Sequence, residues 1–307
     1  METEPTEPEP IPHDNTQQVE PGTAVQINGW LVSLLYDPSS DSNISETVRN
    51  GAVGVVQSCA ETMRNGKITW AYQLTSGDYV LAYNTTVLGQ DVDRASFTGA
   101  TAQSTDEGET LSFTGQGTPV IYSNIVENTL EIHLYDTDVA SDFAVDGSAL
   151  VKSVEVSALP DGAGSRLVLH FDQPLWGHTV EFSNGTTQVL LKPRPVQAQD
   201  PSRPLAGISV LLDPGHGQDD GGAMGVAGAE APVEKDVNLA VSLAAKYRLE
   251  QLGATVHMIR TDDTFLSLQE RNQKITELQP DFFIAVHHNS VDLSVDANQS
   301  AGTECYY

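Results

Sequence analysis

Two histidines and one glutamate in the last third of the 307-residue chain have the types and placement of metal ligands. His216 follows a short apolar run, Glu234 begins a helical pattern, and His287 ends another apolar run. In an open α/β sheet, binding sites form beyond the carboxyl ends of the strands. Two imidazoles and one carboxylate at such an edge match a catalytic Zn²⁺ ion, which takes three protein ligands and keeps a fourth position for water. The pattern therefore predicts a zinc site formed by these three side chains.

Each of these residues also has an ordinary structural interpretation. His216 lies among glycines and could be a turn residue, while Glu234 could be a first-turn acid that the helix dipole favours. His287 could be a core histidine whose hydrogen bonds are satisfied. Two neighbours are rival ligands: Glu230 lies four residues before the glutamate, and His288 would replace His287 if the strand register slipped.

Other charged residues near the predicted site have more than one interpretation. Asp213 could hold a ligand imidazole from behind, or it could be a turn acid at a strand end. Asp220 is expected to order its loop, and Arg260 and Arg271 are expected to form ion pairs or to pack. Glu304 could line a cleft or face solvent.

The elements that must position these residues alternate between strand and helix from Gly207 onward, which is typical of an α/β sheet. Strands are predicted at 208–212, 254–259 and 282–286, and helices at 234–252 and 266–278. Another strand is predicted to begin at 302–307. Gly253 is a natural stop for the first helix, and Thr264 or Ser267 could cap the second. The core-facing stripe predicted for the first helix consists of Ala240, Leu243, Ala244 and Tyr247.

Upstream, the alternation of apolar and polar residues predicts all-β modules. The predicted organisation is a disordered acidic segment at 1–24, a β-rich module at 25–125, a β-sandwich at 126–195 and a Pro-rich linker at 196–206. The sequence RNGK at 64–67 predicts a tight hairpin turn, and a short helix is predicted near 45–50. The predicted fold class is thus an α/β domain preceded by all-β modules.

Several motifs in the last third of the chain occur in the order typical of one enzyme family. They are DPGHG at 213–217, DGGAMG at 220–225, EKDVNL at 234–239, RTDD at 260–263, LQERN at 268–272, FIAVHHNS at 283–290 and GTECYY at 302–307. Together they make residues 207–307 resemble the zinc-dependent N-acetylmuramoyl-L-alanine amidases of the Amidase_3 type. Residues 126–195 resemble the AMIN-type β-sandwich modules that precede such catalytic domains.

The resemblance implies that His216, Glu234 and His287 hold zinc, in a mixed sheet flanked by helices. It also implies hydrolysis of the amide between N-acetylmuramic acid and L-alanine, with peptidoglycan as the partner. The implied location is outside the cell or in the cell envelope. The first residues lack the basic and apolar segments of a signal peptide, so either the protein is cytosolic or its true start is expected further upstream.

The sequence departs from the family pattern in two respects. Gln218 stands where a glycine is usual, and the loop at 225–234 is slightly longer than usual. The family's last helix and strands are expected beyond Tyr307, together with the glutamate that acts as general acid and base. These 307 residues are therefore expected to be an inactive fragment, and Glu304 is the remaining acid that matches the family.

Composition excludes several other classes of function. The chain has 42 acidic residues against 15 lysines and arginines, which gives a formal net charge of −27. It therefore lacks the basic face needed to bind nucleic acid or an anionic membrane surface. The sequence has no stretch near the ~18 consecutive apolar residues of a membrane span. The two cysteines, Cys59 and Cys305, form no CxxC pair.

Two other functions remain compatible with the sequence. The first is a non-catalytic cell-wall-binding or regulatory protein that keeps the zinc site and works through its β modules. The second is a zinc peptidase on a similar sheet, which would accept substrates made of peptide alone.

Overall fold

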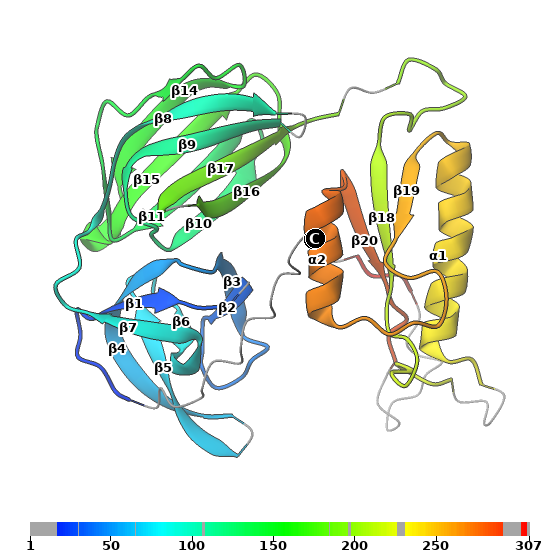
Figure 1. Ribbon diagram of the computed structural model, residues 1–307, viewed down its shortest axis with the longest axis horizontal. Coiled ribbons are helices and arrows are strands. Elements are labelled where there is room, and N and C mark those ends of the chain that lie inside the picture. Colours follow the sequence, from blue (N-terminus) through cyan, green and yellow to red (C-terminus); the bar gives the residue numbers. More distant parts are fainter. Residues whose placement is uncertain are drawn as a thin grey trace, which may run out of the picture. The chain divides into compact units, whose positions relative to one another are not determined.

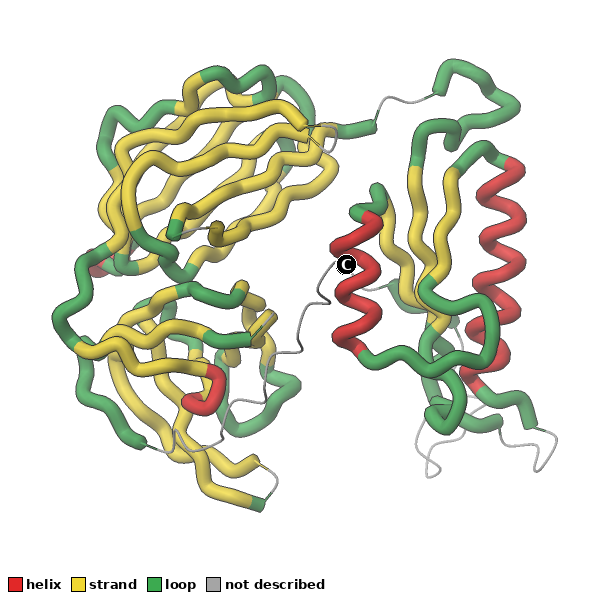
Figure 2. The backbone as a smooth tube through the Cα atoms, in the orientation of Figure 1, coloured by secondary structure: helices red, strands yellow, loops and turns green. Residues whose placement is uncertain are grey.

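The chain divides into two compact units, Met1–Arg194 and Pro195–Tyr307. The computed structural model describes residues 17–29, 31–64, 66–105, 108–183, 185–195, 198–225, 231–290 and 302–305. The first unit is built from strands, and the second combines strands with two α-helices (Figures 1 and 2). The protein is therefore β-rich and contains an α/β domain.

The first seven strands form a sheet in the order β3-β2-β6-β5-β4-β1-β7. They are β1 (Ala24–Ile27), β2 (Leu31–Leu35), β3 (Ile44–Arg49), β4 (Val53–Arg64), β5 (Lys67–Leu74), β6 (Tyr79–Leu81) and β7 (Thr85–Gly89), with the 3₁₀ turn η1 (Ala82–Asn84) before β7. Alternate side chains such as Val25, Ile27 and Tyr72 face a buried core. The predicted hairpin is confirmed, because Arg64 of β4 pairs with Lys67 of β5.

Two predictions for this region are wrong. The segment near 45–50 is strand β3 rather than a helix, because it pairs with β2 along its length. Residues 17–24 are ordered by the sheet: the Tyr72 hydroxyl donates to the Gln17 carbonyl at 2.6 Å, and the Cys59 thiol donates to the Val19 carbonyl at 3.3 Å. Residues 1–16 of the predicted disordered segment lie outside the described residues.

A β-sandwich of two sheets follows. One sheet has the order β10-β11-β15-β14, and the other has the order β12-β8-β9-β17-β16 with β13 beside β8. The elements are β8 (Ala95–Thr105), β9 (Gly108–Gln116), β10 (Ile121–Val126), β11 (Thr129–Tyr135), β12 (Thr137–Val139), β13 (Val145–Asp146), β14 (Val151–Ala158), η2 (Pro160–Gly162), β15 (Gly164–Phe171), β16 (Leu175–Ser183) and β17 (Thr186–Pro193). Inward-facing side chains from both sheets form one apolar core, which includes Phe113, Ile132 and Leu191.

The predicted module boundary at 125/126 is wrong. Strands β8 and β9 precede that point in the chain, but they belong to the sandwich, because β9 pairs with β17 at Leu111–Val189 and Ser112–Gln188. This pairing joins segments that are far apart in sequence, so local periodicity could not reveal it. The likeness of the sandwich to AMIN-type modules stays a prediction.

The C-terminal unit contains a sheet in the order β19-β18-β20. Its elements are β18 (Ser209–Pro214), α1 (Glu234–Gln251), β19 (Thr255–Met258), α2 (Leu268–Leu278) and β20 (Phe282–Val286). The central strand β18 is buried, with Leu211 and Leu212 at most 1% exposed. The three strands of this sheet, β18, β19 and β20, are parallel, whereas the resemblance implies a mixed sheet. Residues 302–305 form no strand, contrary to prediction, and residues 306 and 307 lie outside the described part.

Both predicted helices are present, with ends within two residues of the predicted ones. Ser267 caps α2, because its hydroxyl accepts a hydrogen bond from the Glu270 amide and the Glu270 carboxylate accepts one from the Ser267 amide. Gly253 follows the last residues of α1 with a φ of 101°, as its predicted role as a stop requires. None of the described helices has the length and apolar character needed to cross a membrane.

The predicted core stripe of α1 is wrong. Leu243 is 42% exposed and Tyr247 is 66% exposed. The buried residues of α1 are instead polar: Glu234, Asn238 and Ser242. Helix α1 turns this side inward because Glu234 and Asn238 bond to the ends of the neighbouring strands and because Ala245 and Leu249, on the same side, pack against the core of the sheet.

Candidate metal centre

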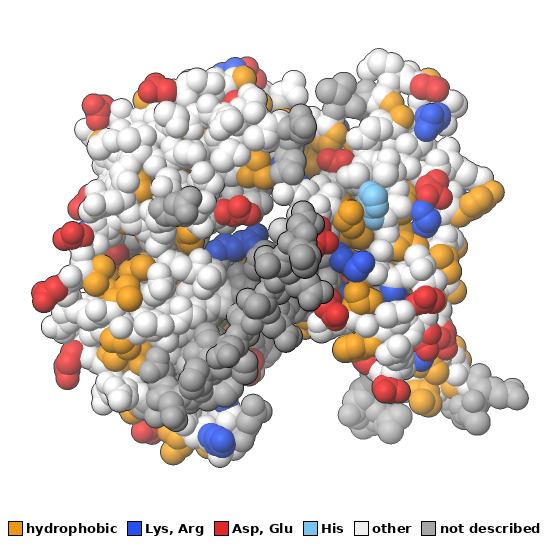
Figure 3. Space-filling model, in the orientation of Figure 1, with side chains coloured by type: hydrophobic (Ala, Val, Ile, Leu, Met, Phe, Trp, Pro, Cys, Tyr) orange, Lys and Arg blue, Asp and Glu red, His pale blue; other side chains and the backbone are white. Residues whose placement is uncertain are grey.

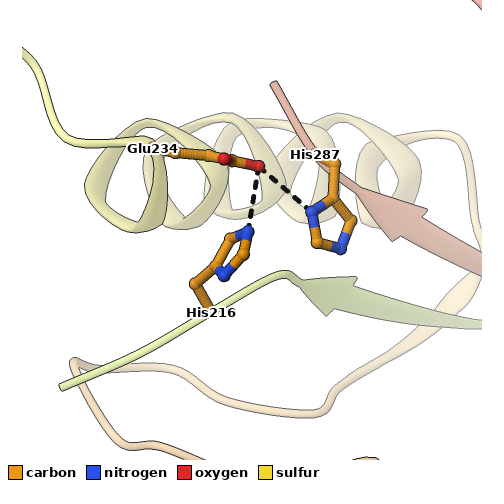
Figure 4. A group of neighbouring side chains, drawn as sticks. All are labelled: His216, Glu234 and His287. Carbon is orange, nitrogen blue, oxygen red and sulfur yellow. Dashed lines mark hydrogen bonds and ion pairs between the residues drawn. The ribbon is translucent and has the colours of Figure 1, made fainter. Parts of the chain in front are cut away.

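The three predicted ligands come together at the carboxyl edge of the parallel sheet. His216 lies just past the end of β18, and His287 directly follows β20. These strands are neighbours, with Pro214 in register with Val286, so both histidines leave the sheet at the same edge. Glu234 is the first residue of α1 and points between the two rings (Figure 4).

One carboxylate oxygen lies between the two imidazoles. Glu234 Oε1 is 3.2 Å from His216 Nε2 and 3.1 Å from His287 Nδ1. The ring centroids of the two histidines are 4.9 Å apart, with an interplanar angle of 81°. One ligand atom from each of the three residues lies within 4.8 Å of the others, and this is the one such group of His, Cys, Asp and Glu found among the described residues.

This arrangement fits a zinc ion. Ligand atoms at zinc distances in a tetrahedral site lie about 3.3 Å from each other, close to the separations between Glu234 and the two rings. Two glycines keep the surrounding space open. A Cβ on Gly215 would lie 2.2 Å from His287 Cε1, and one on Gly222 would lie 2.5 Å from His216 Cδ2. Two imidazoles and a carboxylate also form a donor set that Zn²⁺ accepts.

Hydrogen bonds keep Glu234 charged in its buried position. Burial alone would raise the pKa of this carboxyl, but the bonds it accepts lower the pKa to about 2. The Ala223 amide donates at 2.7 Å and the His288 amide at 3.0 Å, and the side chains of Asn238 and His287 add to the effect. Glu234 is therefore ionised at neutral pH and able to bind a cation.

Asp220 has a role at this site that the sequence did not predict. Both of its carboxylate oxygens lie 2.9 Å from His216 Nδ1. A carboxylate there fixes the proton on Nδ1, which leaves Nε2 free to face Glu234 and a metal. The predicted loop-ordering role is also present, because the Gly222 amide donates to Asp220 at 3.2 Å. The sequence signal that could have predicted this contact is the spacing, since Asp220 lies four residues after His216.

Asp213 pairs with an arginine and not with a ligand imidazole. Its buried carboxylate accepts a hydrogen bond from Arg271. The prediction that Arg271 forms an ion pair is therefore confirmed, and Asp213 supports the site only through that arginine. Arg260, by contrast, donates mainly to backbone carbonyls.

The rival residues have different surroundings. The His288 ring faces Asn238, with 2.6 Å between His288 Nδ1 and Asn238 Oδ1, and only its backbone amide reaches Glu234. Glu230 lies outside the described residues, so its role as a rival ligand stays untested. Glu304 is exposed, and its carboxylate accepts a hydrogen bond from Asn289 at 3.3 Å.

Asn238 is a second residue that the sequence did not single out. It is fully buried one turn after Glu234, and its amide donates to the Gly215 carbonyl at 3.3 Å and to Glu234 at 3.4 Å. It therefore links α1 to the loop that carries His216. The sequence signal for this role is that Asn238 is a polar residue one turn after Glu234, on the same helix face.

Comparison with known proteins agrees with the motifs. Residues 210–307 match the family model Amidase_3, described as N-acetylmuramoyl-L-alanine amidase. The resemblance stated from the sequence motifs is thereby confirmed for this segment.

Individual relatives match the same part of the chain. N-acetylmuramoyl-L-alanine amidase LytC of Bacillus subtilis is 38% identical over 104 residues, which are 34% of this chain and 19% of LytC. The uncharacterised protein YqiI of Bacillus subtilis is 40% identical over 106 residues, covering 34% of this chain and 47% of YqiI. The probable cell wall amidase LytH of Staphylococcus aureus is 37% identical over 91 residues, covering 30% of this chain and 29% of LytH.

Among solved structures, the catalytic domain of the amidase CwlV from Bacillus (Paenibacillus) polymyxa is 36% identical. The match covers 29% of this chain and 49% of that one, with a TM-score of 0.27. The matched segment thus spans less than half the length of each of these relatives.

Proposed function

We propose that the C-terminal unit is a zinc-dependent peptidoglycan amidase that hydrolyses the bond between N-acetylmuramic acid and L-alanine. The observation that supports this most strongly is the group formed by His216, Glu234 and His287, which lies within the segment that matches Amidase_3. The names of LytC and LytH as amidases support the same reaction. This proposal places the protein at the cell envelope or outside the cell, with peptidoglycan as its partner.

In this proposal His216, Glu234 and His287 hold one Zn²⁺ ion. When bound, the ion would polarise the substrate carbonyl and bring the pKa of a water molecule to about 7. The other residues of the site prepare its geometry. Asp220 orients the His216 ring, and Asn238 joins the first turn of α1 to the backbone at Gly215.

Amide hydrolysis also needs a group that takes a proton from water and gives one to the leaving amine. The family resemblance implies a late glutamate for this role, and Glu304 is the remaining candidate among the described residues. Its carboxylate accepts a hydrogen bond from Asn289, which lies two residues after His287, so this contact ties Glu304 to the strand end that carries a proposed ligand. The expectation that these 307 residues are inactive by themselves stays a prediction.

The reaction is tested by the release of L-alanine-terminated peptides from soluble muropeptides. The zinc-loaded 307-residue chain and the full product of its gene are assayed side by side. We expect turnover in the full gene product, with loss of turnover in Glu234→Gln. The matched control is Glu250→Gln, which changes an exposed glutamate on the same helix that pairs with Lys246.

The outcomes separate the proposed functions. If the 307-residue chain turns over and Glu304→Gln does not, Glu304 is the acid and base. Cleavage of peptide-only substrates without cleavage at the lactyl amide would indicate a peptidase. Zinc-loaded protein that sediments with cell walls but releases nothing in either form would indicate a binding protein.

A further inference from the structure

Two arginines are buried behind the loop that carries His216. Arg260 is 3% exposed and Arg271 is 6% exposed. Burying a guanidinium is costly unless its donors are satisfied. Backbone carbonyls of one short segment, Pro214 to His216, accept hydrogen bonds from both side chains.

Arg260 ties the loop to the helix that carries Glu234. Its Nε donates to the Pro214 carbonyl at 2.9 Å, and its Nη2 donates to the Gly215 carbonyl at 2.9 Å. The same Nη2 donates to the Lys235 carbonyl in the first turn of α1 at 2.8 Å. One planar side chain thus fixes the distance between the backbones on either side of the candidate metal centre.

Arg271 holds the loop from α2. Its Nη2 donates to the His216 carbonyl at 3.0 Å, and its Nη1 donates to the Pro214 carbonyl at 3.1 Å and to the Asp213 carboxylate. Together the two arginines donate hydrogen bonds to the carbonyls of three successive residues, the last of which is His216 itself. All three carbonyl oxygens therefore point at the arginines.

The loop that they hold has an unfavourable backbone conformation. His216 has a φ of 65° and Gln218 a φ of 48°, in the left-handed region that residues with a Cβ avoid. Such conformations persist where surrounding contacts fix them, and they concentrate at functional sites. The contacts that hold His216 include the Arg271 bond to its carbonyl, the Asp220 bond to its ring and the contact of its ring with Glu234.

We propose that Arg260 and Arg271 are positioning residues that hold the His216 loop in its metal-binding conformation before a metal arrives. The inference rests on the metal site of the proposed function. Lysine cannot replace either residue in this role. Its ammonium is one compact group, whereas the planar guanidinium has several N–H donors that reach separate carbonyls at the same time.

The first test measures zinc affinity in Arg260→Lys and Arg271→Lys by competition with a chelator. We expect each variant to bind zinc about 10- to 100-fold more weakly and to show a changed visible spectrum when loaded with Co²⁺. The matched control is Arg64→Lys, which alters a similar arginine in the N-terminal unit that donates to the Met63 and Pro38 carbonyls. Wild-type zinc affinity and an unchanged Co²⁺ spectrum in both folded variants would overturn the proposal.

A second test needs no variant and covers the case in which the variants fail to fold. Amide hydrogen exchange is measured on the wild-type chain with and without zinc. The Gly217 amide donates to the Asp220 carbonyl and the Gln218 amide to Asp263, so both are expected to exchange slowly even without metal. Protection that develops only after zinc is added would overturn the proposal. A wild-type chain that takes up no zinc, yet protects these amides, would instead contradict the proposed function.

Discussion

At the scale of single residues, the candidate metal centre depends on the charge of Glu234. One of its oxygens contacts both histidine rings, and the other accepts a hydrogen bond from the Ala223 amide. These contacts favour the ionised carboxylate and outweigh the opposing effect of burial. The carboxylate is thus ready to bind a cation, and its ionisation must also contribute to the stability of the folded unit.

Acid should remove that contribution. The pKa of Glu234 is lowered from 4.5 to about 2, so its stabilising effect is complete above pH 4.5 and is lost as the pH falls towards 2. The difference in unfolding free energy between metal-free wild type and Glu234→Gln should therefore shrink by up to about 3 kcal/mol across this range. Denaturant titrations at several pH values measure it. A difference that stays constant from pH 5 to pH 2 would show that the carboxylate is not held in its charged form.

Asp220 should control how well His216 binds metal. Asp220→Ala removes the acceptor for His216 Nδ1 and is expected to weaken zinc binding about 10- to 100-fold. Asp220→Asn keeps an oxygen acceptor and should restore part of the affinity. Asp219→Asn is the control, because Asp219 is an exposed neighbour of the same charge. Equal zinc affinity in all three variants would show that Asp220 has no part in metal binding.

At the scale of elements, helix α1 shows how a site, together with apolar contacts, can contribute to which side of a helix faces inward. Its buried residues Glu234, Asn238 and Ser242 are spaced four apart, so they form one polar stripe. Two of them bond to the strand ends. The hydroxyl of Ser242 is buried with no hydrogen-bond partner among the described residues.

Removing that hydroxyl should stabilise the unit. Ser242→Ala ends the cost of an unsatisfied buried group and improves helix propensity, so we expect the free energy of unfolding to rise by about 1 kcal/mol. Ser209→Ala is the matched control. Its hydroxyl bonds to Asp281 beside β20, so its loss should lower the free energy of unfolding by about 1 kcal/mol. Thermal or urea unfolding measures both, and a clear loss of stability in Ser242→Ala would mean that its hydroxyl has a partner.

The elements also show where sequence reasoning succeeds. Strand β20 follows from a short apolar run, and the sequence offered Thr264 or Ser267 as the cap of α2, of which the structure uses Ser267. The three candidate ligands follow from their places at element ends. The face of α1 could not be predicted, because its apolar periodicity pointed to Leu243 and Tyr247 while contacts with the strand ends turned the opposite side inward. The pairing of β9 with β17 depends on residues distant in sequence, which no local pattern records.

At the scale of the whole molecule, the chain combines a β-rich unit with an α/β unit that holds the candidate metal centre. Acidic side chains are spread over both units, and basic ones occur singly or in small groups on the face shown in Figure 3. The net charge of −27 makes an anionic polymer an unfavourable partner for non-specific binding. If the proposed function is correct, recognition of the cell wall depends on local contacts.

The N-terminal unit should matter for wall binding and not for chemistry. The described residues of that unit contain no group of metal-binding side chains. Removal of residues 1–194 is expected to leave zinc content and any muropeptide hydrolysis largely intact, while sedimentation with intact cell walls weakens. Comparing the full chain and the shortened one in both assays tests this. Equal sedimentation of the two would assign wall binding to the C-terminal unit.

The most direct test of the central claim is the zinc content of the purified chain. Wild type should hold about one zinc per molecule, since two imidazoles and a carboxylate make one site. His216→Ala, Glu234→Ala and His287→Ala should each lose it. His170→Ala should keep it, because that histidine contacts Glu155 in the sandwich of the other unit. Unchanged zinc in the three site variants would contradict the account.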